Sequence, residues 1–466
     1  MDNFLFIDSP MFYPAGVKFF TQGSSPKILS EFVDFLYSRA HVIDTVYLCL
    51  YLYNNEILHN ALLNLSKKGI PVHVISIPLE GYDSAKPRDL YDANQPLSPA
   101  LKSQTKYDLA EKLYRGVKNS PVDYFTLHIF PHMYIRSPRV RPFSRGRMPY
   151  SLHGKSFYIK YKTGGGAMGL TSSNLAARDL VKDELMVVSE NDPASNIAAQ
   201  AFFNALISNA IPIDDFDDGK GYYDYPIKRC QIAVPKSNTL YIAPFYQNAQ
   251  AKAEMFLQNL IKGARERVLL CAQHICAPGI LGAILEKSKD GVAVRCLSQT
   301  FVDGAGRSHG CRRPENTGAF GDFIREYEKY DHCAYAANES VHSKFIIVDD
   351  TAVVTTCNLT PTQFIYRENV NISRFDNMPG LAYRGIHSEV GQFLVVKDQR
   401  ICKALEENFD SIWCRPATYH HKKQTVKNSG NVKICRLCGG SMAQRNGRFG
   451  PFWGCVSFPK CKHTEN

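Results

Sequence analysis

The sequence lacks an uninterrupted apolar run of about 18 residues, so no membrane-spanning helix is expected. Its first residues, Met1-Asp2-Asn3-Phe4, lack the charged and apolar blocks of a signal peptide, and we therefore expect a cytoplasmic protein. It contains no Walker motif and no Gly-x-Gly-x-x-Gly after a strand pattern, so neither type of nucleotide site is predicted. No carboxylate cluster is suited to Mg²⁺, and no catalytic metal is expected.

At 466 residues the chain is long enough for two or three domains. Because 44% of these residues are hydrophobic, we expect a globular protein. Fourteen cysteines in an unexported chain indicate reduced thiols plus a metal site. The net charge is +11, and residues 415–466 hold ten Lys or Arg and one acidic residue, or +9 of it. A short basic module on a nearly neutral body is typical of nucleic-acid binding, although a solubilising tail would look the same.

Two short stretches repeat the same polar residues at matched spacing. Each has a His and a Lys two positions apart, then an Asn, and a Glu ten positions after the Asn: His153, Lys155, Asn174 and Glu184 in the first, His342, Lys344, Asn358 and Glu368 in the second. Residues two apart on a strand share a face. The imidazole, ammonium and carboxamide could therefore converge, and this combination suits a phosphate group.

The repeat extends upstream of the His-x-Lys stretches. Each copy has a short apolar run, a helical pattern that ends at a glycine, and a second strand-like run: Thr45–Leu50, Glu56–Lys68, Gly69 and Ile70–Ile75 in the first, Arg267–Ala272, Ile280–Lys289, Gly291 and Val292–Leu297 in the second. We interpret them as two βαβ units, each followed by a strand that carries His-x-Lys.

These residues resemble the phospholipase D superfamily over roughly residues 40–415. Its signature is His-x-Lys, four residues, Asp, a Gly-Ser-x-Asn-like turn and a later Glu. The second copy carries the Asp as Asp349, whereas Lys160 stands there in the first, and Thr171 and Thr355 replace the Gly of the turn. The resemblance implies an α/β fold of two phospholipase D-like halves, residues 1–215 and 216–414, related by a pseudo-twofold axis.

The resemblance also implies a two-step phosphoryl transfer through a phosphohistidine, without a catalytic metal. His153 is the expected nucleophile and His342 the acid and base. Glu184 and Glu368 are expected to hold the imidazole N–H of their own copy's histidine. The Lys and Asn of each copy would stabilise the phosphoryl oxygens, whereas Asp349 is expected to brace its strand.

Near the C-terminus, four cysteines have the spacing of a four-thiolate zinc site: Cys435, Cys438, Cys455 and Cys461. Together with Gly439, Met442 and Phe452-Trp453-Gly454, they resemble the C4 zinc ribbon at the ends of bacterial type I topoisomerases. We expect one structural Zn²⁺ in a ribbon over residues 433–466, after a basic linker over residues 415–432. The resemblance implies DNA binding, often to single strands.

Several basic and aromatic side chains are candidate DNA contacts. They lie in an insertion before His153, in the linker and in the ribbon: Arg141, Arg145, Arg147, Lys422, Lys423, Arg445, Arg448, Phe452 and Trp453. Phe452 and Trp453 could equally form the small core of the ribbon.

Three functions compete at this point. The leading hypothesis is a DNA phosphodiesterase, an endonuclease of a restriction or defence kind, with DNA as partner, no membrane, and a regulatory or defence-system protein as a further candidate partner. The alternatives are a phospholipid hydrolase or phosphatidyltransferase, and a non-catalytic DNA-binding protein.

Overall fold

The structure, a computed structural model, describes residues 2–8, 27–77, 106–130, 151–175, 182–216, 240–243, 249–302, 308–310, 323–324, 326–327, 329–364, 389–420, 433–437, 441–447, 450–455 and 461–465. By their contacts, the residues form two compact units. The first comprises Met1–Ala253, Val354–Cys357 and Pro361–Val395, and the second comprises Glu254–Val353, Asn358–Thr360 and Val396–Asn466.

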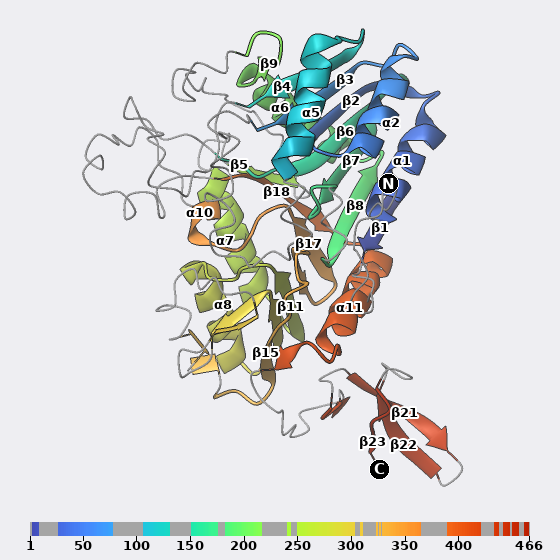
Figure 1. Ribbon diagram of the computed structural model, residues 1–466. Helices are drawn as coiled ribbons and strands as arrows, with labels where there is room; N and C mark the ends of the chain where they lie inside the picture. Colours follow the sequence, from blue (N-terminus) through green and yellow to red (C-terminus); the bar gives the residue numbers. More distant parts are fainter. Residues whose placement is uncertain are drawn as a thin grey trace, which may run out of the picture. The chain divides into compact units, whose positions relative to one another are not determined.

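The first large sheet has eight strands in the order β1-β8-β7-β6-β2-β3-β4-β9 (Figure 1). Their bounds are β1 Asp2–Asp8, β2 Ile43–Leu50, β3 Val72–Ser76, β4 Phe125–Ile129, β6 Lys155–Tyr161, β7 Gly166–Thr171, β8 Glu184–Glu190 and β9 Ile211–Pro212. Strands β2, β3 and β4 are mutually parallel, as a βαβ unit requires, whereas β6 is antiparallel to β2.

The second large sheet repeats this order as β10-β18-β17-β16-β11-β12-β15-β19. Its strands are β10 Leu240–Ala243, β11 Arg267–Ala272, β12 Ala293–Ser298, β15 Cys333–Ala337, β16 Phe345–Val348, β17 Thr351–Thr355, β18 Glu389–Val396 and β19 Tyr419–His420, and β5, Ser151–Leu152, also pairs with β18. Because β11 and β12 are parallel and β16 is antiparallel to β11, the duplication predicted from the sequence is confirmed. The pseudo-twofold axis stays a prediction.

Helices cover both faces of the first sheet. Phe157 and Tyr158 are neighbours on β6 and therefore point to opposite faces. The Phe157 ring lies 4.5 Å from that of Phe32 on α1, whereas Tyr158 stacks on Tyr47, which contacts Phe203 on α6. Helices α1 and α6 thus pack on opposite faces. The helices are α1 Lys27–Arg39, α2 Glu56–Ser66, α5 Lys106–Asn119, α6 Pro193–Ser208, α7 Ala249–Lys262, α8 Pro278–Lys289, α10 Pro361–Phe364 and α11 Gln399–Trp413.

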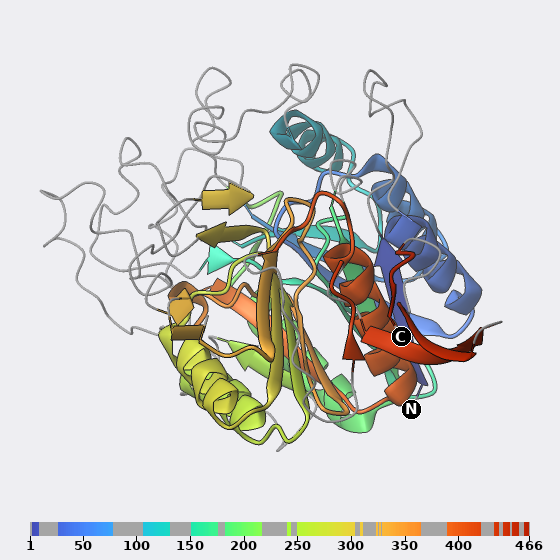
Figure 2. The same ribbon diagram turned by 90° about the horizontal axis from the view of Figure 1, so that it is seen from below.

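The second sheet lies between α7 and α8 on one side and α11 on the other (Figures 1 and 2). Helices α2 and α8 are each followed closely by a glycine in the left-handed region, Gly69 at φ 79° and Gly291 at φ 84°. These two glycines terminate the helices where the sequence pattern predicted, because glycine adopts this conformation without steric cost. Among the helices that the structure describes, not one has the length and hydrophobicity needed to cross a bilayer.

Residues near the C-terminus form a separate four-stranded sheet in the order β20-β21-β22-β23, with bounds Lys433–Ile434, Ser441–Gly447, Gly450–Cys455 and Thr464–Glu465. A further short hairpin joins β13 Thr300–Val302 to β14 Ser308–Gly310. The start of the expected linker is part of the second sheet, because Tyr419 and His420 pair with β15 as strand β19. The Thr418 hydroxyl also accepts a hydrogen bond from Asn338 Nδ2 at 2.8 Å.

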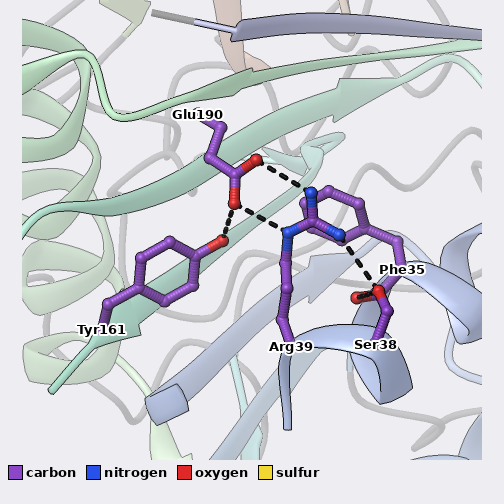
Figure 3. Close-up of polar contacts among 5 residues, drawn as sticks. All are labelled: Phe35, Ser38, Arg39, Tyr161 and Glu190. Carbon is purple, nitrogen blue, oxygen red and sulfur yellow. Dashed lines mark hydrogen bonds and ion pairs between the residues drawn. The ribbon is translucent and has the colours of Figure 1, made fainter. Parts of the chain in front are cut away.

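One end of the first sheet is joined to α1 by a polar cluster (Figure 3). Arg39 donates two hydrogen bonds to the Glu190 carboxylate, from Nε at 2.7 Å and from Nη2 at 2.9 Å, and Tyr161 also donates to Glu190. The guanidinium lies 3.9 Å from the centre of the Phe35 ring. Glu190 and Glu184 are the two ends of β8, so this cluster lies at the opposite end of the strand from the candidate site.

Candidate active site and zinc ribbon

In the first copy, Lys155 and His153 lie close together, as their spacing predicted. Lys155 opens β6, and its Nζ donates to the His153 carbonyl oxygen at 3.2 Å and lies 3.5 Å from His153 Nε2. The ring of Tyr51 lies 5.9 Å from the Lys155 Nζ and 5.9 Å from the His153 ring. The lysine is only 1% exposed, whereas the histidine is half-buried. A fixed positive charge therefore lies directly beside an accessible imidazole.

The second copy repeats this contact. Lys344 is completely buried, and its Nζ donates to the carbonyl oxygen of His342 at 2.7 Å. His342 is half-buried, like His153. Both lysines bond the backbone of their own histidine, so each ammonium is held next to that residue.

The turns that carry the two asparagines are also alike. Thr171 Oγ1 donates to the Leu185 carbonyl at 2.9 Å and accepts from the Ser173 N–H at 3.0 Å. Thr355 Oγ1 makes the same two bonds, to the carbonyl of Gln392 at 2.8 Å and from the N–H of Cys357 at 3.0 Å. The threonines that replace the signature's glycine thus tie each turn to the next strand.

Each turn ends at an asparagine that is half-buried. No described residue donates a hydrogen bond to the Oδ1 of Asn174 or of Asn358. The turns therefore place both carboxamides at corresponding positions of the two copies.

Glu184 is 1% exposed, and its Oε2 accepts a hydrogen bond from Ser172 Oγ at 2.5 Å. Ser172 occupies the place of the Ser in the Gly-Ser-x-Asn-like turn, but the sequence alone assigned it no role. Ser172 Oγ in turn accepts from the Leu185 N–H at 2.9 Å. The expected bond from Glu184 to the imidazole of His153 stays a prediction.

The second copy has no carboxylate at the corresponding strand position. Thr356 occupies the place of Ser172, because its Oγ1 accepts from the N–H of Gln392 at 3.2 Å as Ser172 does from Leu185. Gln392 therefore corresponds to Leu185, and Gly391 corresponds to Glu184. The equal spacing in sequence paired Glu184 with Glu368 instead, and Glu368 lies outside the described residues.

Asp349 braces its strand, as expected. Its carboxylate accepts from the backbone N–H groups of Arg265, Glu266 and Arg267, each at 3.0 Å. Burial raises the pKa of this carboxyl, but the three N–H donors together outweigh burial, so its net pKa is lowered. In the first copy Lys160 forms an ion pair with Asp44 at 2.9 Å instead. The first copy thus has the lysine–histidine contact without an Asp at this position.

Three of the four predicted zinc ligands lie together in the described part of the ribbon. The Sγ atoms of Cys435, Cys455 and Cys461 all lie within 4.8 Å of one another, and those of Cys435 and Cys461 are 3.6 Å apart. Tetrahedral Zn–S bonds of about 2.3 Å place neighbouring sulfurs about 3.8 Å apart. The buried thiols thus fit Zn²⁺, while Cys438 lies outside the described residues.

The two aromatic residues of β22 have different positions in the ribbon. Trp453 packs against the cluster of Cys435, Met442, Cys455 and Cys461, which makes it part of the ribbon core. Phe452 precedes it on the strand and therefore faces the opposite side. In the backbone register of β21 and β22, Phe452 is paired with Arg445. Other candidate DNA contacts fall outside the described residues: Arg141, Arg145, Arg147, Lys422, Lys423 and Arg448.

Two family descriptions match parts of the chain. Residues 257–378 match "Cardiolipin synthase, PLD-like domain", and residues 432–466 match "Topoisomerase DNA binding C4 zinc finger". DNA topoisomerase 1 of Campylobacter jejuni is 56% identical over 44 residues, which are 9% of this chain and 6% of that protein.

Solved structures also resemble the chain at low sequence identity. Phosphatidylserine synthase of Haemophilus influenzae is 14% identical with a TM-score of 0.49, covering 84% of this chain and 86% of that one. NucT from Helicobacter pylori is 14% identical, with a TM-score of 0.27 and coverage of 38% and 94%. Nuc, a phospholipase D family member from Salmonella typhimurium, is 15% identical, with a TM-score of 0.27 and coverage of 39% and 96%.

Proposed function

We propose that this chain, which carries a phospholipase D-like domain and a topoisomerase-type C4 zinc ribbon, is a DNA phosphodiesterase, an endonuclease of a restriction or defence kind. The observation that carries the proposal is the repeated contact of a buried lysine with the carbonyl of its own histidine, at His153 and His342. The chain also carries a basic ribbon that matches a family described as DNA binding. DNA is therefore the phosphodiester substrate that agrees best with both parts of the chain.

The proposed reaction uses one histidine of each copy. His153 attacks phosphorus and forms a phosphohistidine, while the ester oxygen leaves with a proton from His342. His342 then takes a proton from water, which attacks phosphorus and frees His153. Lys155 and Lys344 stabilise the charge on the phosphoryl oxygens throughout, so the reaction needs no catalytic metal.

Asn174 and Asn358 are proposed to donate their side-chain N–H groups to the same oxygens. Glu184 is proposed to orient the imidazole of His153, with Ser172 holding the carboxylate in place. The second-copy counterpart proposed from the sequence remains Glu368.

DNA binding is assigned to the ribbon and the basic segments around it. Structural zinc, held by Cys435, Cys455, Cys461 and Cys438, would keep together a segment too small to fold on its own core. Phe452, on the face away from the cysteines, would stack on a base, and Arg445 beside it would contact a phosphate.

A phospholipid substrate is the second candidate, because residues 257–378 match a family described by cardiolipin synthase. The ribbon argues against it, since the family that residues 432–466 match is described as DNA binding. A non-catalytic DNA-binding protein is the third candidate. The lysine–histidine contacts argue against it, because a site without function would have no reason to retain both buried lysines.

The deciding experiment compares substrates on one preparation. Purified protein is incubated with single-stranded DNA, duplex DNA and phosphatidylglycerol vesicles, with brief exposure to EDTA so that ribbon zinc is retained. We expect DNA cleavage that persists in EDTA and is lost in His153→Ala and in His342→Ala. Lipid turnover without DNA cleavage would support the second candidate, and DNA binding without turnover the third. Activity that vanishes in EDTA and returns with Mg²⁺ alone would refute the metal-free mechanism.

A further inference from the structure

The backbone of His153 is held by strand β18. Strand β5 pairs in parallel with β18, with Ser151 opposite Glu389 and Leu152 opposite Val390. The N–H of His153 then donates to the Val390 carbonyl at 3.3 Å. This inference rests on the proposed function, in which His153 is the nucleophile. The nucleophile of the first copy is then positioned by β18, a strand that follows the His342 motif of the second copy.

The residue after Val390 is a glycine whose missing side chain leaves room for a thiol. A Cβ atom at Gly391 would lie 1.9 Å from Cys357 Sγ and 3.2 Å from Thr356 Oγ1. Cys357 is completely buried, so its thiol packs directly on the backbone of β18. The Thr356 N–H also donates to the Gln392 carbonyl at 3.2 Å, which fixes this turn to the same strand.

A second thiol occupies the equivalent space beside His153 itself. A Cβ atom at Gly154 would lie 2.9 Å from Cys49 Sγ and 3.9 Å from the Val390 carbonyl oxygen. Burial raises the pKa of the Cys49 thiol to about 12, with Lys155 opposing the shift, so this group stays neutral and fills space. Each partner of the His153–Val390 hydrogen bond is thus followed by a glycine that packs against a buried thiol, Gly154 against Cys49 and Gly391 against Cys357.

We infer that Cys357 and Gly391 are positioning residues for His153. The thiol fills the volume that a side chain at position 391 would need, and this packing holds β18 where Val390 can accept the His153 N–H. Neither residue takes part in the reaction. The first copy has Glu184 at the position of Gly391, so the arrangement is particular to the second copy.

The test uses a pair of substitutions with two readouts. Gly391→Ala would push the thiol and β18 apart, so we expect faster hydrogen exchange of the His153 amide. We also expect kcat for DNA cleavage to fall about 100-fold with KM little changed, because misplacement of a reacting group by about 1 Å has that effect. Adding Cys357→Ala should restore both the protection and kcat. Gly282→Ala, in a helix with open space around that position, is the matched control.

Unchanged exchange and kcat in Gly391→Ala would overturn the inference, as would a double variant that restores neither. If Gly391→Ala does not fold, Cys357→Ser and Cys357→Val provide the same comparison. Serine should keep His153 protected, and the bulkier valine should expose it; equal exchange in both would refute the inference. A wild-type protein that cleaves no DNA would refute the proposed function alone, because the exchange measurement does not depend on activity.

Discussion

The Nζ atom of Lys344 donates a 2.7 Å hydrogen bond to the carbonyl oxygen of His342, and the lysine is completely buried. Burial of an ammonium group is costly because it loses its hydration. Under the proposed function, a cation kept in such a place in both copies would contribute more to binding an anion than to holding the fold together.

We therefore expect Lys344→Met, and likewise Lys155→Met, to lose activity while keeping stability. Methionine is similar in volume and removes the buried charge, so Tm should stay constant or rise. The kcat should fall about 10²- to 10³-fold, as when one preorganised donor to a developing charge is lost. Thermal unfolding and cleavage assays on the same samples measure both. A large fall in Tm with normal specific activity would show that the lysines are structural.

The topology of the two halves was predictable because βαβ units leave a clear pattern. Buried strands such as Arg267–Ala272 are short apolar runs, and helix ends such as those at Gly69 and Gly291 need a left-handed residue. The sequence predicted that each Lys lies close to its His, but on a strand face. The structure places His153 before β6 and both His342 and Lys344 before β16, and each lysine bonds the backbone carbonyl of its histidine.

The role of Glu368 as the carboxylate of the second copy stays a prediction, because this residue lies outside the described residues. Equal intervals paired Glu184 with Glu368, but register is set by hydrogen bonds, and these align Glu184 with Gly391. The spacing of residues in the sequence does not show how many residues lie between a turn and the strand to which it is hydrogen-bonded. The close packing of Cys357 on Gly391 depends on that register and was invisible for the same reason.

The bidentate contact between Arg39 and Glu190 should stabilise the first sheet without affecting chemistry. The side chains of Arg39 and Glu190 are only 24% and 10% exposed, and Arg39→Ala leaves the carboxylate without its main partner. We expect a loss of about 1–3 kcal/mol in the free energy of unfolding. Specific activity below the unfolding transition should be unchanged, because Glu190 is at the far end of β8 from Glu184.

An exposed ion pair provides the control for this variant. Lys403 and Glu407 are 4.0 Å apart with side chains 78% and 69% exposed, so Lys403→Ala should change stability by less than about 0.5 kcal/mol. Urea denaturation of the three proteins makes the comparison. Equal stability of Arg39→Ala and Lys403→Ala would contradict the structural role of Arg39.

Asp349 should make stability depend on pH in the acid range. Its pKa is lowered in the folded state, so the carboxylate stabilises the fold above the ordinary Asp pKa of about 3.9. This contribution is lost as pH falls through the lower folded pKa. Asp349→Asn is a suitable variant because Asn tolerates the left-handed backbone at this position, φ 50°.

The Tm difference between wild type and Asp349→Asn should therefore be largest near neutral pH and shrink as the solution is acidified through that range. Thermal melts at several pH values measure it, with Asp350→Asn, a neighbouring exposed position, as control. A difference that grows on acidification would have the wrong sign for a carboxyl with a lowered pKa.

Removal of the ribbon should weaken DNA binding and leave the chemistry in place. The truncation belongs after His420, because Thr418 and strand β19 are part of the second sheet. Without the basic segment, log Kd should depend less steeply on log salt, by about 0.9 for each phosphate of duplex DNA that the protein no longer neutralises. Cleavage should persist at high enzyme concentration and low salt. An unchanged affinity and slope would assign DNA binding to a different part of the chain.

Within the ribbon, Phe452→Ala should weaken DNA binding alone, whereas Trp453→Ala should also impair zinc binding. Phe452 lies on the face away from the cysteines, so its loss should cost roughly 1–3 kcal/mol of single-strand binding while bound zinc stays at one per chain. Trp453 packs on Cys435, Cys455 and Cys461, so its loss should release zinc and reproduce the effect of Cys435→Ser. Zinc content and DNA titrations on the same samples separate the two effects. Loss of zinc in Phe452→Ala, or intact zinc with weakened binding in Trp453→Ala, would reverse the assignment of the two faces.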